Sequence, residues 1–257
     1  MSNGELRVGF VGAGYIADWH AACLKEIPGL RLSAICDIAR SAAEALAGAH
    51  GATAFTSLDA MLAARVCDAV FVLTPPHLHR DIAERALAAG CHVFVEKPFA
   101  LSRVDCEDIN RAAKAAGRVA AVNHNFLGLP SYARLNAALT DGLIGRIDSV
   151  DIFWRFPFPP LRSGPFSAWP LRARENLLLE LGPHLFAFAD DLCGPLTDLR
   201  LDVGRPVRLP TGIETYQSWR IAARAGGAEI SMHVSLVEGF DDRSLALRGT
   251  VGAARLD

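Results

Sequence analysis

The chain has 257 residues, of which 51% are hydrophobic and 21% are charged, a composition that suits a globular protein of one large domain or two modest ones. Its formal net charge of -2 comes without a basic stripe or an acidic tail, so the charge does not favour a nucleic-acid or membrane-surface partner. No apolar run approaches the ~20 residues that a membrane span needs.

The six cysteines form neither a CxxC pair nor a Cys/His cluster at zinc spacing, so we expect no metal site. Most of them lie in apolar segments, which predicts buried thiols in a reducing compartment. The first residues, MSNGELRVGFVGAG, lack a basic region followed by an apolar region and a cleavage site, and they run directly into a predicted strand. These features predict a cytoplasmic protein without a signal peptide.

The first half of the chain alternates between short apolar segments and segments with helical apolar spacing. Such alternation predicts a parallel sheet with helices on both faces, an α/β Rossmann fold over residues 1–123. The expected strands are 6–11, 30–37, 53–57, 67–74, 91–96 and 118–123, and the expected helices are 15–27, 39–51, 58–66, 77–90 and 102–117.

The rhythm changes after Asn123, where we place a domain boundary, and residues 124–257 form the second predicted domain. Strand-like segments joined mostly by short turns predict an α+β domain with an open, largely antiparallel sheet. The expected strands are 146–156, 197–205, 213–225, 228–237 and 243–252, the expected helices are 130–145 and about 180–193, and an aromatic, proline-rich loop occupies 157–170.

A glycine-rich turn links the first strand to the first helix, with Gly12, Gly14 and Ala17 in a G-x-G-x-x-A pattern. Glycines there let the backbone approach a pyrophosphate at a helix N-terminus. Asp37, 25 residues after Gly12, ends the second strand and could bind ribose hydroxyls, which favours NAD over NADP. Arg40 could instead pair with a 2'-phosphate, so NADP remains possible. A tight turn without a ligand is the alternative interpretation.

Lys97 stands in the segment EKPFA, directly after an expected strand. The chain has only three lysines, at 25, 97 and 114. The carboxyl ends of the strands face the ligand crevice of such a sheet, so Lys97 is expected to point at a cofactor. A solvated lysine in a turn is the simpler alternative.

Glu180 and His184 lie four residues apart, a spacing that puts them on one face of a helix. Pro183 is tolerated only in a first helical turn, so we expect the helix to begin close to Glu180. His184 is a candidate general base, although an isolated histidine among apolar residues is more often a core residue.

Three segments, GAGYIADWH, TPPHLHRDIAERALAAGCHVFVEKPFAL and LLLELGPHLF, resemble the Gfo/Idh/MocA family of nicotinamide-dependent oxidoreductases. The resemblance implies a Rossmann domain, a C-terminal sheet domain and an active site between them. It also implies that Lys97 contacts substrate and cofactor, that the Lys97–Pro98 bond is often cis, and that Glu180 and His184 correspond to the family's D-x-x-x-H pair.

The motifs and the resemblance together give three groups of candidate site residues. The catalytic group is Lys97, His184 and Glu180. The cofactor-binding group is Gly12, Gly14, Tyr15, Ile16, Asp37, Arg40, Thr74, Pro75, His79, Glu96 and Lys97. The substrate group is Lys97, His124, Asn125, Trp169 and His184.

The chain departs from the family pattern at several positions. Glu175 and Asn176 stand where the family often has Gly-Gly, and Leu127 and Gly128 follow the HN pair where many members carry an arginine. The family generally continues beyond the LRGTVGAARLD of this chain. Either the chain is a fragment, or the second domain has lost its last strands and needs a partner to cover its edge.

These features predict an NAD(P)-dependent dehydrogenase that oxidises a secondary alcohol of a sugar, polyol or cyclitol. We also expect a homo-oligomer formed through the C-terminal sheet. One alternative is a non-redox glycoside hydrolase or lyase that uses tightly held NAD. The other is a non-catalytic, NAD-responsive regulator.

Overall fold

The computed structural model describes residues 5–237, 239 and 241–257, and it divides the chain into two units, 1–123 and 124–257. No helix in the described part of the chain combines the length and apolarity of a membrane span.

The N-terminal unit is built on six parallel strands in the order β3-β2-β1-β4-β5-β6. This is the strand order of a Rossmann fold, and it brings the carboxyl ends of β1, β2, β4, β5 and β6 to one edge. The strands are β1 (Leu6–Val11), β2 (Leu30–Cys36), β3 (Thr53–Phe55), β4 (Ala69–Val72), β5 (His92–Val95) and β6 (Ala120–Val122). The helices are α1 (Tyr15–Lys25), α2 (Arg40–His50), α3 (Leu58–Ala63), α4 (His79–Ala88) and α5 (Arg103–Ala116), with a 3-10 turn, η1 (Pro76–Leu78), before α4.

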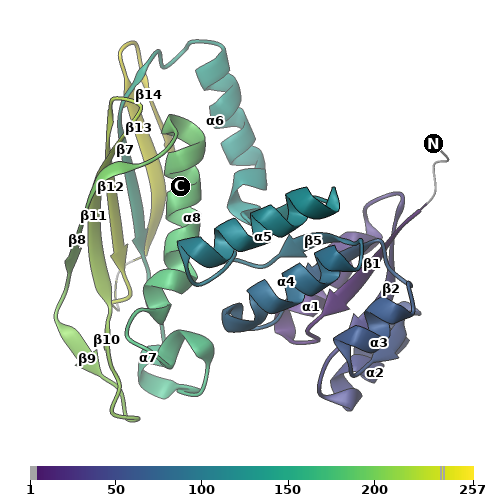
Figure 1. Cartoon of the computed structure of the whole chain (residues 1–257). Coiled ribbons are helices and arrows are strands. Elements are labelled where there is room, and N and C mark those ends of the chain that lie inside the picture. The colour runs from purple at the N-terminus through teal and green to yellow at the C-terminus, as the bar shows by residue number, and fades with distance from the viewer. Residues whose placement is uncertain (1–4, 238, 240) are drawn as a thin grey trace. The chain divides into compact units, whose positions relative to one another are not determined.

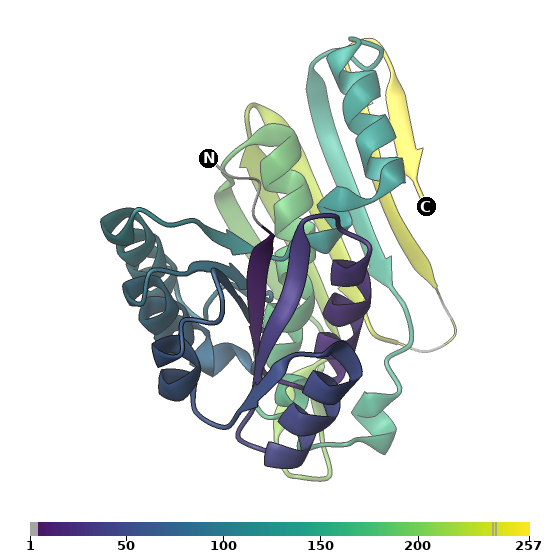
Figure 2. The ribbon, with the colours of Figure 1, turned by 90° about the vertical axis from the view of Figure 1, so that its right-hand side faces the viewer.

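Two apolar cores lie on opposite faces of this sheet, as expected for strands that are apolar throughout. One core joins α1 and α2 to β1 and β2, through side chains such as Phe10, Ala17 and Leu46. The other joins α3, α4 and α5 to β4 and β5, through side chains such as Val70, Leu87 and Ile109. Figure 2 shows α1 on one side of the sheet and α4 and α5 on the other.

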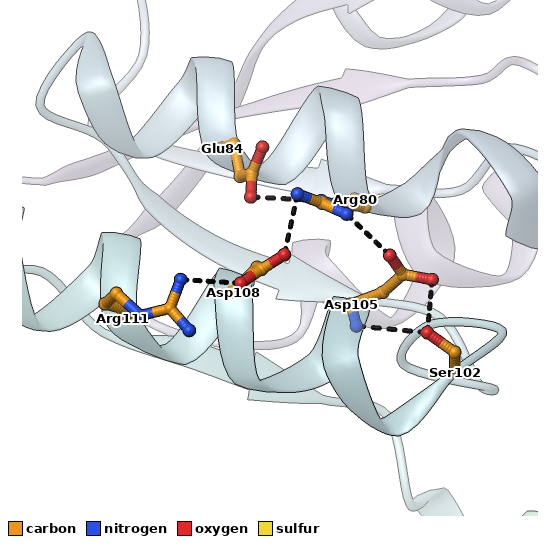
Figure 3. Close-up of polar contacts among 6 residues, drawn as sticks. All are labelled: Arg80, Glu84, Ser102, Asp105, Asp108 and Arg111. Atoms are coloured by element: carbon orange, nitrogen blue, oxygen red, sulfur yellow. Dashed lines mark hydrogen bonds and ion pairs between the residues drawn. The ribbon is translucent and has the colours of Figure 1, made fainter.

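Arg80 of α4 ties the two outer helices together, as Figure 3 shows. Its guanidinium lies 2.8 Å from Asp105 Oδ1 and 2.6 Å from Asp108 Oδ2, both on α5. Ser102 caps α5 by accepting the Asp105 backbone N–H. This network holds α4, and α4 begins at the candidate site residue His79.

The C-terminal unit is built on a six-stranded sheet in the order β14-β13-β7-β12-β11-β8, with a separate two-stranded ribbon of β9 and β10. The strands are β7 (Ile147–Arg155), β8 (Thr197–Val203), β9 (Pro206–Arg208), β10 (Glu214–Tyr216), β11 (Ser218–Ala225), β12 (Ala228–Ser235), β13 (Asp242–Gly249) and β14 (Ala253–Leu256). The helical segments are η2 (Asn125–Gly128), α6 (Pro130–Thr140), α7 (Pro160–Ser163), η3 (Trp169–Leu171) and α8 (Asn176–Cys193).

One face of this sheet packs against α8, as Figure 1 shows. Alternate residues of β11 and β12 point into this core, among them Ile221, Ile230 and Met232, while their neighbours point outward. Helix α6 lies beside β14, which is visible in Figure 2. The outward face carries mainly charged and polar side chains.

Three details of this unit differ from the sequence-based expectation. The single strand expected at 213–225 breaks after Tyr216, because β10 pairs with β9 while β11 pairs with β8 and β12. A further strand, β14, follows β13. The sheet is largely antiparallel, but β7 and β12 run parallel, because α7, η3 and α8 separate them in the chain and remove the need for a hairpin.

The prediction that a helix begins close to Glu180 was wrong, because α8 begins at Asn176 and contains Pro183. A proline inside a helix costs about 3 kcal/mol or more. The first turn of α8 is stabilised by burial of Leu177 and by the Asn176 side chain, which donates to the Trp169 carbonyl at 2.7 Å. Glu180 and His184 still lie one turn apart on the same helix.

The prediction of buried thiols was correct only in part. Cys36, Cys67 and Cys91 are buried, whereas Cys23 is exposed. Cys23 lies on α1, whose outward side faces solvent within the N-terminal unit, so an apolar neighbourhood in sequence did not ensure burial.

Candidate active site

The glycine turn has the backbone geometry that its sequence predicts. Gly12 has φ +105°, which an L side chain rarely adopts, and its N–H donates to the Cys36 carbonyl at 2.8 Å. A Cβ atom at Gly12 would lie 2.7 Å from the Leu73 carbonyl oxygen. Gly12 is therefore required by the close approach of β1 to the end of β4.

At position 14, no such contact requires a glycine. A Cβ atom there would meet no heavy atom of the described chain within 4 Å, so the space in front of Gly14 is open. Gly14 is also the N-cap of α1, where backbone N–H groups of the first turn point outward. An open space at a helix N-terminus fits the approach of a pyrophosphate. Of the two neighbouring candidates, Tyr15 is exposed and Ile16 is half-buried.

Asp37 links the glycine turn to the end of β2. Its Oδ2 accepts the Ala13 N–H and its Oδ1 accepts the Ala39 N–H, both at 2.8 Å. Each carboxylate oxygen has a second lone pair, so Asp37 can still accept bonds from ribose hydroxyls. Arg40 is directed to Glu44 at 3.5 Å, and 73% of its side chain is exposed.

The end of β4 is held by His79, whose ring is fully buried. Its Nε2 lies 2.8 Å from the Thr74 carbonyl and its Nδ1 lies 2.9 Å from the Pro98 carbonyl. Burial lowers the pKa of His79, and a neutral ring has one N–H to donate to these two acceptors. His79 thus joins the segments after β4 and β5. The Thr74 hydroxyl is buried without a hydrogen-bond partner in the described part of the chain, and Pro75 follows it.

Glu96, at the end of β5, is surrounded by donors. Its Oε1 lies 2.7 Å from His20 Nε2 and 2.7 Å from Asn123 Nδ2, and its Oε2 accepts the Lys97 N–H at 3.1 Å. Burial raises the pKa of Glu96, but the bonds from His20 and Asn123 outweigh it and hold the pKa below its usual value. The Lys97–Pro98 peptide bond is cis, as the resemblance implies.

In the C-terminal unit, His184 lies in an aromatic cage made by Phe126 and Trp154. The ring centroids of Phe126 and His184 are 4.7 Å apart with the planes nearly perpendicular, and those of Trp154 and His184 are 5.5 Å apart. His184 is 6% exposed. The cage fixes the plane of the imidazole ring. Glu180, half-buried, stands one turn earlier on α8.

The substrate candidates of this unit differ in exposure. Asn125 is exposed, whereas His124 and Trp169 are half-buried. Burial lowers the pKa of His124, although Asp190 opposes this effect, and His124 Nδ1 has no hydrogen-bond partner among the described residues. The described residues contain no group of three or more His, Cys, Asp or Glu side chains suited to a metal ion.

The structure therefore brings the cofactor candidates of the N-terminal unit to one edge of its sheet, and it places Glu180 and His184 on α8. Reasoning from sequence assigned no role to His20, Asn123 or Phe126. His20 lies inside the quoted segment GAGYIADWH, but 76 residues separate it from Glu96, so no spacing pattern indicated the pair.

Comparison with known proteins shows which family the chain resembles along its length. Residues 6–124 match a family model described as "Oxidoreductase family, NAD-binding Rossmann fold", and residues 132–255 match one described as "GFO/IDH/MocA C-terminal domain". An inositol 2-dehydrogenase of Rhizobium meliloti is 37% identical over 60% of this chain and 47% of its own length. A D-glucoside 3-dehydrogenase of Escherichia coli is 35% identical over 57% of this chain and 42% of its own length.

These matches cover less than half of each curated relative. Among solved structures, the WlbA dehydrogenase of Bordetella pertussis, in complex with NADH and UDP-GlcNAcA, superposes with a TM-score of 0.88 at 27% identity, over 99% of this chain and 74% of that one. The chain belongs to the Gfo/Idh/MocA family of oxidoreductases, and its N-terminal unit has the family's NAD-binding Rossmann fold.

Proposed function

We propose that the protein is an NAD-dependent dehydrogenase that oxidises a secondary alcohol of a sugar, polyol or cyclitol. The observation that carries this proposal is the joint geometry of Asp37 and Gly14. The Asp37 carboxylate anchors the glycine turn through Ala13, and the space in front of Gly14 is open at the N-terminus of α1. This arrangement suits the ribose and pyrophosphate of a dinucleotide.

The cofactor proposed is NAD rather than NADP. This choice rests on Asp37, whose carboxylate would repel a 2'-phosphate. The glycine turn would hold the pyrophosphate at the N-terminus of α1. Bound NAD would accept a hydride from the alcohol carbon.

Two side chains are assigned the remaining chemistry. As the C–H bond breaks, His184 takes the hydroxyl proton, and the alcohol becomes a ketone. Lys97, a cation at the carboxyl end of β5, stabilises the negative charge that develops on the oxygen. Glu180 orients the histidine or binds a neighbouring hydroxyl. His124, Asn125 and Trp169 are proposed to contact the substrate.

The substrate class is supported by what the relatives act on, since their names include an inositol dehydrogenase and a D-glucoside dehydrogenase. Both names describe ring compounds that carry several hydroxyl groups. We therefore place the substrate of this chain among carbohydrates and cyclitols.

The first test is a fluorescence titration of the full chain with NADH and, separately, with NADPH. We expect saturable binding of NADH that is tighter than that of NADPH. Asp37→Ala should weaken NADH binding by about tenfold or more, as expected for the loss of a charged acceptor. Asp59→Ala, which removes an exposed carboxylate on α3, is the matched control and should bind NADH normally. Equal binding of NADH to wild type and Asp37→Ala would refute the assignment of Asp37.

The second test is turnover. Wild-type protein is incubated with NAD and a panel of inositols, glucosides and open-chain polyols, and NADH is followed by its absorbance. Accumulation of NADH supports a dehydrogenase. A substrate that is consumed without NADH accumulation would instead identify the non-redox use of held NAD. NADH binding with no turnover of any kind would favour the regulator.

Homo-oligomerisation through the C-terminal sheet is part of the proposal. The outward face of that sheet carries arginines and acids in alternation, such as Arg224 with Glu229 and Arg248 with Asp151. A second copy with the same pattern could pair with it across a two-fold axis. Sedimentation of the full chain tests this point, and a monomer at micromolar concentration would contradict it. A cytoplasmic location is likewise proposed, on the basis of the cysteine pattern.

A further inference from the structure

Three elements of the N-terminal unit meet at the Glu96 carboxylate. His20 comes from α1, Asn123 follows β6, and Glu96 directly follows β5. His20 Nε2 and Asn123 Nδ2 both lie 2.7 Å from the same oxygen, Oε1. The other oxygen, Oε2, accepts the backbone N–H of Lys97 at 3.1 Å.

The surroundings of His20 are apolar on one side. Phe10, Phe71 and Phe94 stand in register on β1, β4 and β5, and each presents its ring to His20 at a centroid distance of 5.8 to 6.3 Å and a steep interplanar angle. The Glu96 carboxylate is itself buried, and a buried carboxylate is stable only when donors surround it. His20 is therefore fixed by packing on its ring and by a hydrogen bond at its Nε2.

Glu96 has little capacity left for a ligand. It is 8% exposed, and both of its oxygens are engaged by groups of this chain. Direct cofactor contact, which the sequence led us to expect for Glu96, does not suit this geometry. Glu96 is instead suited to positioning its neighbours, because its Oε2 accepts the backbone N–H of the next residue, Lys97.

We propose that His20 and Asn123 are positioning residues of the dehydrogenase reaction, which orient Glu96 and through it the backbone of Lys97. The network also joins two parts of the site, since α1 begins at the glycine turn and Lys97 lies two residues after the end of β5. The inference rests on the proposed function for the role of Lys97. The hydrogen bonds themselves do not depend on it.

The test measures the Lys97 amide directly, by residue-resolved hydrogen exchange of the 15N-labelled full chain. His20→Leu keeps an apolar side chain against the three phenylalanines and removes the donor. We expect exchange of the Lys97 amide to become about tenfold faster, as for the loss of a hydrogen bond to a charged group. The Glu96 amide, which donates to the Val72 carbonyl in the sheet, should not change.

Three further variants make the result specific. His20→Gln retains a side-chain N–H at the position of Nε2 and should restore slow exchange at Lys97. Asn123→Leu removes the second donor to the same oxygen and should resemble His20→Leu, which gives an independent result if His20→Leu does not fold. His50→Leu, at the end of α2, is the matched control and should leave the Lys97 amide unchanged.

Turnover gives the second measurement. With a substrate found in the screen, His20→Leu should lower kcat about tenfold with little change in KM for NAD, and His20→Gln should recover most of the loss. Unchanged Lys97 exchange in both His20→Leu and Asn123→Leu would overturn the proposal, whatever the enzyme does. Failure of wild-type protein to bind NADH would refute the proposed function, and the exchange data would still decide whether the network holds Lys97.

Discussion

In the N-terminal unit the candidate site is held by directional hydrogen bonds, which connect Asp37 to Ala13 and Glu96 to His20. In the C-terminal unit the candidate base, His184, is held by the rings of Phe126 and Trp154. Hydrogen bonds depend on charge and donor geometry, whereas ring packing depends on volume and shape. The site residues of the N-terminal unit should therefore be sensitive to isosteric changes of polarity, and His184 should be sensitive to changes in the size of the rings that pack against it.

The largest expected effect is on catalysis. His184→Leu keeps an apolar side chain against the rings of Phe126 and Trp154, and loss of the general base should lower kcat by about 10²- to 10⁴-fold. Lys97→Met should lower kcat by about 10²- to 10³-fold, because a charge-stabilising group is lost. Steady-state kinetics on a substrate from the screen measures both.

Substitutions of the other two lysines are the controls for Lys97→Met. Lys25→Met and Lys114→Met change the other two lysines, at the ends of α1 and α5, and should keep wild-type kcat. If His184→Leu retains kcat, the histidine is a packing residue of the C-terminal core, and the aromatic cage has no catalytic purpose.

The next effect separates folding from ligand binding at the glycine turn. Gly12→Ala forces a Cβ atom against the Leu73 carbonyl at a positive φ, and should cost about 2–4 kcal/mol of folding free energy. Gly14→Ala meets no atom of the described chain, so it should keep the wild-type melting temperature and lose NADH affinity. Thermal unfolding and the NADH titration, run on both variants, distinguish the two roles. A similar fall in melting temperature for both would mean that the space at Gly14 is needed for folding.

The smallest effect concerns pH. The pKa of Glu96 is lower in the folded chain than its usual value, so the charged carboxylate stabilises the fold above the pKa of the unfolded state. That contribution is lost as the pH falls through the folded-state pKa. Glu96→Gln should lower the stability at neutral pH by about 1–3 kcal/mol and reduce its fall on acidification. Thermal unfolding between neutral and acidic pH measures this, and parallel curves for the variant and wild type would contradict it.

The sequence was informative where all residues that form a feature lie in one short segment. The pattern of Gly12, Gly14 and Ala17 predicted the turn at the start of α1, and the alternation of apolar segments predicted each strand of the Rossmann sheet. The parallel pairing of β7 with β12 and the separation of β10 from β11 were not predicted, because pairing between distant strands has no local signature.

The candidate site likewise contains residues that the sequence predicted and residues that it did not. Lys97, Asp37 and His184 could be named from motifs, because strand ends and helical spacing place them in a fold of this class. The residues that contact them could not be named from motifs. His20 reaches Glu96 from a distant helix, and Phe126 reaches His184 from a turn before α6.

The sequence by itself determined the fold class, the glycine turn and the residue types available for dinucleotide chemistry, because backbone conformation and apolar periodicity are local properties. Only the tertiary structure decided that His20 and Asn123 share one oxygen of Glu96, and that His184 packs against two aromatic rings. Those contacts join side chains from separate elements, and the packing of the whole unit brings them within reach of one another.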